Sequence, residues 1–371
     1  MAVSKIFFTN TRCRVGTSLL HKMDKLVRQA GIERIDFNRK YVAIKVHFGE
    51  PGNLSFVRPN YAKTLVDLVK SLGGKPFLTD CNTLYVGRRN NALAHLDAAY
   101  ENGFSPFSTG CHVLVGDGLK GTDDLEVPVN GGMLIKNAKI GRAVMDADVL
   151  ISLNHFKGHE MTGFGGAIKN VGMGCGSRAG KMEMHSDAEP QVSEKRCAGC
   201  RTCVKYCAQG AISFKENKAV IDQKLCVGCG RCIGVCNFHA IAPKLYNNGE
   251  TVSRKMVEYA KAVVDGRPGF HINIVTQVSP CCDCHGENDA AVVPDIGIFA
   301  GFDMVALDKA CIDAVNAAPA ISSSVLGDKD AHSRDHFCRI HPGVDWRPQI
   351  AHAEAIGLGS GEYELVSLDC A

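Results

Sequence analysis

The sequence lacks the features of membrane, secreted and nucleic-acid-binding proteins. No run of apolar residues reaches the ~18 that a membrane-spanning helix needs. The opening MAVSKIFFTN has no charged segment followed by a long apolar core, so we expect no secretory signal. A net charge of +3 over 371 residues gives no electrostatic reason for binding nucleic acid. We therefore expect a protein that associates with neither membrane nor nucleic acid.

Two common cofactor motifs are also missing. The segment GFGGAIKN does not have the G-x-G-x-x-G spacing of a nicotinamide-binding turn, and the chain has no GK[ST] phosphate-binding loop. The composition, 45% hydrophobic and 22% charged, is typical of a globular protein. A chain of 371 residues is long enough for two or three domains with a substantial core.

Cysteine, by contrast, is abundant, and eight of the 18 cysteines form two copies of the pattern C-x2-C-x2-C-x3-C. This is the bacterial ferredoxin run, which holds cubane iron–sulfur clusters. A zinc site instead uses two short pairs of ligands that together bind one ion, and two runs of four cysteines do not follow that pattern. The copies lie 29 residues apart in RCAGCRTCVKYCAQGAI and LCVGCGRCIGVCNFHAI. The sequence therefore predicts two [4Fe-4S] clusters.

In such runs the fourth cysteine binds the cluster held by the other run. The predicted ligands of one cluster are Cys197, Cys200, Cys203 and Cys236, and those of the second are Cys226, Cys229, Cys232 and Cys207. Ten further cysteines accompany these oxygen-labile clusters, which favours a reducing cytoplasm over an export compartment. An anaerobic host fits the same chemistry.

The rest of the chain alternates strand-like and helix-like segments. The predicted strands are 5–9, 41–48, 75–80, 113–117, 148–156, 271–278 and 296–300, and the predicted helices are 17–31, 58–74, 90–103, 251–266 and 302–316. This alternation predicts an α/β fold, with a mostly parallel sheet covered by helices on both faces. We expect the α/β domain to comprise residues 1–190 and 246–371. The ferredoxin module, 193–243, is inserted between them, and Lys181–Arg196 reads as a polar linker.

In open α/β sheets, ligands bind beyond the carboxyl ends of the strands. Polar residues there are common in any α/β protein, but the density of histidine and cysteine here favours a shared crevice. The crevice would also include residues 10–13, which follow the first strand.

Residues 154–185 contain eight glycines. A helix that starts within 164–169 would cradle an anion with its free amides, unless the stretch is merely a linker. The candidate substrate-binding or catalytic residues are His47, Asp80, His155, Lys157, His159 and Lys169.

The segment CCDCHG suggests a third metal or cluster site. Its ligands would come from Cys281, Cys282, Cys284 and His285, with Cys175 as a further thiolate. Adjacent cysteines rarely form a disulfide with each other. A redox-active pair of thiols and chemically inert cysteines are the alternatives.

Several segments together resemble the iron–sulfur centre proteins of the domain-of-unknown-function 362 family. They are KVHFGEPGN, NHFKGHEMTGFGGAIKN, the double cysteine run, SPCCDCHG and FDMVALDKA, and they extend over nearly the whole chain. The resemblance implies the fold and the iron–sulfur cofactor, and it implies no particular activity.

The segment HEMTGFGGAIK is more distantly similar to the nickel-pincer lactate racemases, whose pattern is roughly H-x3-G-x-x-G-G-x-K. This similarity implies that His159 is an acid/base residue and that Lys169 tethers the pyridinium pincer. It also implies that His185, sixteen residues after Lys169, is a metal ligand.

We expect an iron–sulfur oxidoreductase in which a redox partner protein reduces the ferredoxin module, and electrons pass to the crevice. Lys157, Lys169 and Arg178 favour a small anionic substrate. One alternative is a non-catalytic electron-carrier subunit whose crevice docks a partner. The other is a racemase-like enzyme with a metal cofactor tethered to Lys169.

Overall fold

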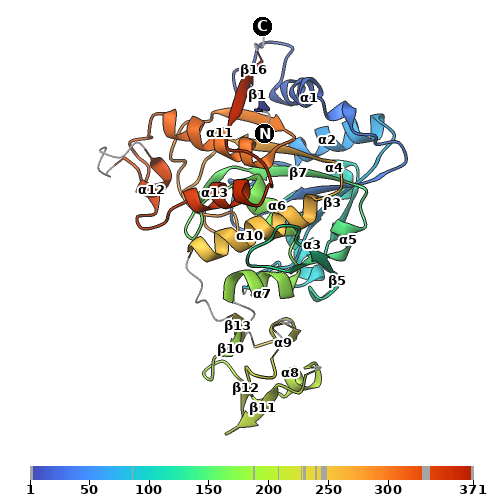
Figure 1. The fold of residues 1–371 in the computed structure, drawn as a ribbon, viewed down its shortest axis with the longest axis vertical. Coiled ribbons are helices and arrows are strands. Elements are labelled where there is room, and N and C mark those ends of the chain that lie inside the picture. Colours follow the sequence, from blue (N-terminus) through green and yellow to red (C-terminus); the bar gives the residue numbers. More distant parts are fainter. Residues whose placement is uncertain are drawn as a thin grey trace.

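The computed structural model describes residues 3–85, 87–186, 189–207, 209–226, 228, 231–238, 240–243, 249–327 and 335–368. Its centre is an eight-stranded sheet in the order β16-β1-β15-β14-β7-β2-β3-β4 (Figure 1). Only β15 runs antiparallel to its neighbours, so the predicted α/β fold with a mostly parallel sheet is confirmed. The strands are β1 (Ser4–Asn10), β2 (Tyr41–Val46), β3 (Lys75–Asp80), β4 (His112–Val115), β7 (Val149–His155), β14 (Gly269–Val275), β15 (Gly297–Gly301) and β16 (Tyr363–Ser367).

Two apolar cores lie on opposite faces of this sheet. Along β2, Val42 and Ile44 belong to one core and Ala43 to the other, as the two-residue period of a strand requires. The first core takes in α1 (Leu19–Gln29) and α2 (Pro59–Ser71). The second takes in α6 (Ala167–Cys175), α10 (Gly249–Val264), α11 (Met304–Ala317) and α13 (Arg347–Ala355). The remaining helices are α3 (Ala92–Glu101), α4 (Pro106–Thr109), α5 (Arg142–Met145), α7 (Arg178–Ser186), α8 (Thr202–Lys205), α9 (Arg231–Gly234) and α12 (His336–Ile340), with a 3₁₀ turn at Ile32–Arg34.

The helices begin where the local sequence provides a start signal. The Ser18 hydroxyl accepts the His21 N–H at the start of α1, and Pro59 occupies the first turn of α2. None of the helices in the described part of the chain is both long and apolar enough to cross a membrane.

Four two-stranded ribbons complete the structure. They are β5 (Asp124–Pro128) with β6 (Asn137–Gly141), β8 (Lys157–His159) with β9 (Gly163–Gly165), β10 (Pro190–Val192) with β13 (Ile241–Pro243), and β11 (Ile212–Lys215) with β12 (Lys218–Ile221). The last two ribbons, with α8 and α9, gather beyond α7 at one end of the molecule (Figure 1). This group, here called the small lobe, has its own apolar centre around Ile212, Ala219, Ala240 and Ile241.

The prediction of a linker over Lys181–Arg196 is wrong for its first part. Residues up to Ser186 belong to α7, and Met182 and Met184 are fully buried. The segment is polar, but the methylene stem of Lys181 and the side chains of Met182 and Met184 still pack against neighbouring elements such as α10. The helix therefore forms one wall of the α/β domain.

Candidate functional site

A cavity of about 650 Å³ lies at the carboxyl ends of the parallel strands. The elements around it are the ends of β2 and β3, the β8–β9 hairpin, α6, α7 and the loop after β14. Of the residues predicted from sequence, the structure brings together on its walls His47, Asp80, Lys157, His159, Lys169, His185, Cys284 and His285.

Other predicted residues lie elsewhere. His155 is buried behind the wall, and Cys175 lies beside Cys81, whose thiol donates to the Cys175 carbonyl over 3.4 Å. Residues 10–13 after the first strand do not line the cavity. The physical reason is the strand order: β15 and β14 stand between β1 and β7, which the chain order did not reveal.

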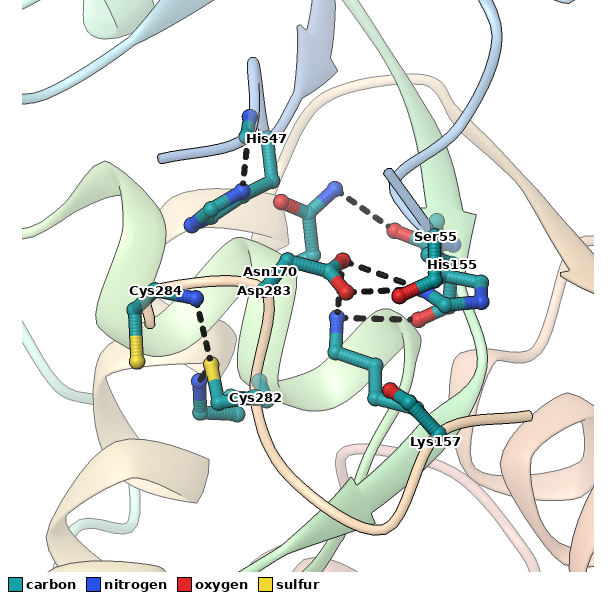
Figure 2. Close-up of polar contacts among 12 residues, drawn as sticks. His47, Ser55, His155, Lys157, Asn170, Cys282, Asp283 and Cys284 are labelled. Atoms are coloured by element: carbon teal, nitrogen blue, oxygen red, sulfur yellow. Dashed lines mark hydrogen bonds and ion pairs between the residues drawn. The ribbon is translucent and has the colours of Figure 1, made fainter. Parts of the chain in front are cut away.

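The sulfur of Cys282 is surrounded by hydrogen-bond donors (Figure 2). The Lys169 ammonium lies 3.0 Å from it, and the Cys284 N–H lies 3.4 Å away. His159 accepts N–H bonds from the backbone of residues 161 and 162 at Nδ1, which leaves its Nε2–H to donate to the same sulfur. A hydrogen bond from the Cys284 thiol, with the charge of Lys169 and the hydrogen bond from His159, holds the Cys282 pKa well below its usual range. These neighbours therefore stabilise the thiolate form of Cys282.

Asp283, between these two cysteines, faces the other way (Figure 2). Its fully buried carboxylate is 2.9 Å from His155 Nδ1 and 3.1 Å from Lys157 Nζ. Burial alone would raise the Asp283 pKa, but these two neighbours hold it below its ordinary value. Lys157 thus balances an internal charge, and the expected role in binding a substrate anion is weakened.

A second buried charge network underlies the cavity. The Asp80 carboxylate lies 3.0 Å from Lys45 Nζ and 3.4 Å from Arg89 Nη1, and Arg89 Nε donates to Glu50 over 2.8 Å. Burial disfavours the charge on Asp80, yet Lys45, His95 and their neighbours lower its pKa well below the ordinary value. The charges therefore compensate one another, and they fix the ends of β2 and β3.

The start of α6 does not serve as an anion site for an external ligand. The N–H groups of Ala167 and Ile168 donate to the carboxylate of Asp308 on α11, over 2.7 and 2.9 Å. The side-chain amide of Asn273 donates to the same carboxylate over 2.8 Å. The predicted helix start is present, and the protein's own carboxylate occupies the predicted cradle.

We expect Asp308→Ala to destabilise the protein by about 3 kcal/mol. The variant loses a helix cap, worth ~0.5–2 kcal/mol, and leaves the buried Asn273 amide unsatisfied, at ~1–3 kcal/mol. Denaturant unfolding followed by the fluorescence of Trp346, the single tryptophan, measures the loss. The matched control is Asn91→Ala, which removes the half-exposed cap of α3, where water can replace the side-chain oxygen. Equal losses of unfolding free energy in the two variants would contradict the expectation that removing the buried Asp308 carboxylate costs more than removing a half-exposed cap.

In the small lobe, four cysteines line one small cavity of about 20 Å³: Cys197, Cys200, Cys203 and Cys236. These are three cysteines of the first run and the last cysteine of the second. Backbone N–H groups point at the sulfurs, from Ala219 to Cys197 over 3.4 Å and from Ala240 to Cys236 over 3.3 Å. The matching bond in the other half runs from Ala211 to Cys207 over 3.3 Å.

The glycine before the second cysteine of each run has a left-handed backbone. Gly199 and Gly228 both have φ of +68°, a conformation that favours glycine. A Cβ on Gly199 would also approach the Asn217 carbonyl oxygen to 2.5 Å. The two runs thus share this backbone conformation at the corresponding glycine. Of the residues predicted for the second cluster, Cys229 lies outside the described residues.

Sequence reasoning missed several residues of the crevice. Glu160 follows His159 in the β8–β9 hairpin, and its side chain comes within 3.0 Å of His285 Nε2. Arg89 is 1% exposed and also lines the cavity. The only sequence signal for these residues is the pair His159-Glu160 in KGHE, because no short motif marks Arg89.

A model of the family described as Domain of unknown function (DUF362) matches residues 42–313, and the chain belongs to this family. Two solved structures are similar. One, described as the lactate racemase apoprotein from Thermoanaerobacterium thermosaccharolyticum, is 12% identical with a TM-score of 0.37, and the match covers 81% of this chain and 54% of that one. The other, a protein from Thermotoga maritima, is 14% identical with a TM-score of 0.40, and the match covers 80% and 58%. The chain thus spans little more than half the length of either. No curated protein matches it.

Proposed function

We propose that this member of the DUF362 family is an iron–sulfur electron-transfer protein whose small lobe holds two [4Fe-4S] clusters and exchanges electrons with the crevice. The observation that carries the proposal is the cavity formed by Cys197, Cys200, Cys203 and Cys236. This set follows the crossed pattern of bacterial two-cluster ferredoxins. The second cluster would be held by Cys226, Cys229, Cys232 and Cys207.

The small lobe also supplies what such a group needs from the protein. Thiolate ligands carry negative charge, and the N–H bonds to Cys197, Cys207 and Cys236 stabilise that charge. Hydrogen bonds to the sulfurs also tune the reduction potential. When bound, the clusters supply single electrons at low potential.

The small lobe meets the crevice along α7. Arg178, at the start of this helix, is 1% exposed, and its charge acts on Cys232 of the second run. Its Nε and Nη1 have no hydrogen-bond partner within the described part of the chain. Lys181 and His185 on the same helix line the crevice, as does Ala242 of β13. The strand β13 therefore borders both sites, with Ile241 at the small cavity and Ala242 at the crevice, and this proximity favours electron transfer between them.

The crevice is the proposed reaction site of an oxidoreductase. Since Lys157 and Lys169 are paired with Asp283 and Cys282, we propose that His47 and Lys181 bind the substrate, a small anion. His47 accepts the Gly49 N–H at Nδ1 over 3.1 Å, so its Nε2–H is left to donate. Burial and the charge of Arg89 hold the His47 pKa well below its usual range. A redox partner protein would supply the electrons.

Iron and acid-labile sulfide analysis of protein purified anaerobically tests the proposal. We expect about eight of each per chain, and a paramagnetic signal from both clusters after reduction with dithionite. Zinc in place of iron, or iron without sulfide, would contradict it. Small anions that shift the signal of the reduced protein would favour an oxidoreductase over a carrier subunit.

A further inference from the structure

A trio of unlike side chains meets at the wall of the crevice. One ligand atom each from Glu160, Cys284 and His285 lies within 4.8 Å of the other two. They come from two separate segments, the turn of the β8–β9 hairpin and the loop after β14. All three are half-buried and line the cavity.

We propose that Glu160, Cys284 and His285 bind one divalent transition metal ion, zinc or ferrous iron. A carboxylate oxygen, an imidazole nitrogen and a thiolate sulfur together select borderline metals over magnesium or calcium. Three protein ligands facing a cavity leave a fourth position open, which is the arrangement of catalytic rather than structural zinc sites. The site does not depend on the electron-transfer proposal, because none of its ligands lies in the small lobe.

One carboxylate oxygen of this trio has no hydrogen-bond partner within the part of the chain that the structure describes. Oε1 of Glu160 pairs with His285 Nε2, but its Oε2 is buried and has no hydrogen-bond partner among the described residues. A buried carboxylate oxygen without a partner costs free energy, and a bound cation would remove that cost.

The surrounding bonds hold the loop in place. The His285 N–H donates to the Cys282 carbonyl over 3.1 Å, and the Asn53 amide donates to the His285 carbonyl over 3.1 Å. The Glu50 N–H, next to the cavity, donates to the Asp283 carbonyl over 3.1 Å. Ligands fixed in this way lose little conformational freedom when the metal binds.

The other cysteines of the segment have different surroundings. The sulfur of Cys282 already accepts from Lys169, and Cys175 lies beside Cys81. The trio therefore involves only one cysteine of CCDCHG. This favours a single ion over a cubane cluster at this place, and the ion would displace the thiol proton that Cys284 donates to Cys282.

Cobalt(II) is the probe for the test, because a thiolate–cobalt bond gives a charge-transfer absorption band. The full chain with its iron–sulfur clusters in place is titrated with Co²⁺, and its metals are measured by mass spectrometry. We expect one further metal per chain and a thiolate–cobalt band. Both should be lost in Cys284→Ser, and Glu160→Gln should weaken cobalt binding at least about tenfold.

Cys281→Ser is the matched control, since Cys281 lies in the same loop outside the trio, and it should behave as the wild type. Cobalt binding without a thiolate band, or an equal band in Cys284→Ser and the wild type, would overturn the proposal. The Glu160→Gln variant keeps the test valid if Cys284→Ser does not fold. If the anaerobically purified chain contained no iron–sulfur clusters but still gave the cobalt band, only the electron-transfer proposal would be contradicted.

Discussion

Replacing Cys203 and Cys236 together by serine should remove about four iron atoms per chain, no more than either single replacement removes. Both residues line the same small cavity, although they come from different runs. If they bind one cluster, the second replacement finds that cluster already lost. Iron and sulfide per chain, measured on protein reconstituted anaerobically and purified by size, give the result directly.

The matched double variant pairs two cysteines of the same run, Cys203→Ser with Cys207→Ser. Crossed ligation assigns these residues to different clusters, so we expect nearly all of the iron to be lost. If each run held its own cluster, the two double variants would exchange their results. The comparison thus tests the crossed assignment without requiring either variant to be active.

The order of strands and helices could be predicted because the local signals agree with the tertiary fold. Strand segments such as 41–48 are rich in β-branched residues, and Ser18 and Pro59 mark helix starts by their own chemistry. The signals failed at β16, which pairs with β1 from the far end of the chain. They also failed at α7, a polar segment that the fold nevertheless buries.

The residues of the site could be predicted only where the residue type by itself indicates a chemical role. Cysteine runs, His47, His159 and Lys169 follow from spacing and position after strands. Their partners do not, because Asp308 reaches α6 across 140 residues or more and Glu160 meets His285 across 125. Such pairs depend on how α11 and the hairpin pack, which a single sequence does not encode in any short window. The same limit explains why the anion cradle of α6 was predicted but its occupant was not.

Arg89→Met should destabilise the protein by about 3–5 kcal/mol. The guanidinium is 1% exposed and lies between the carboxylates of Glu50 and Asp80, with the Tyr85 hydroxyl as a further partner. Removing one member of a buried ion pair leaves the others charged and uncompensated. Methionine keeps most of the volume, so the loss measures charge rather than packing. Denaturant unfolding of the α/β domain, followed by the fluorescence of Trp346, provides the measurement.

The neighbouring residue supplies the control, because Arg88 makes a bidentate pair with Glu101 at the surface, with both distances 2.7 Å. Exposed pairs contribute ~0–1 kcal/mol, so Arg88→Met should have little effect. The comparison belongs at pH 7, since the Asp80 pKa is lowered in the folded state. The stabilisation that ionised Asp80 gives the folded state is complete above the pKa of an unfolded aspartate, about 3.9. It is lost only as the pH falls through the folded pKa of Asp80. Similar losses for Arg88→Met and Arg89→Met would mean that burial does not set the strength of the network.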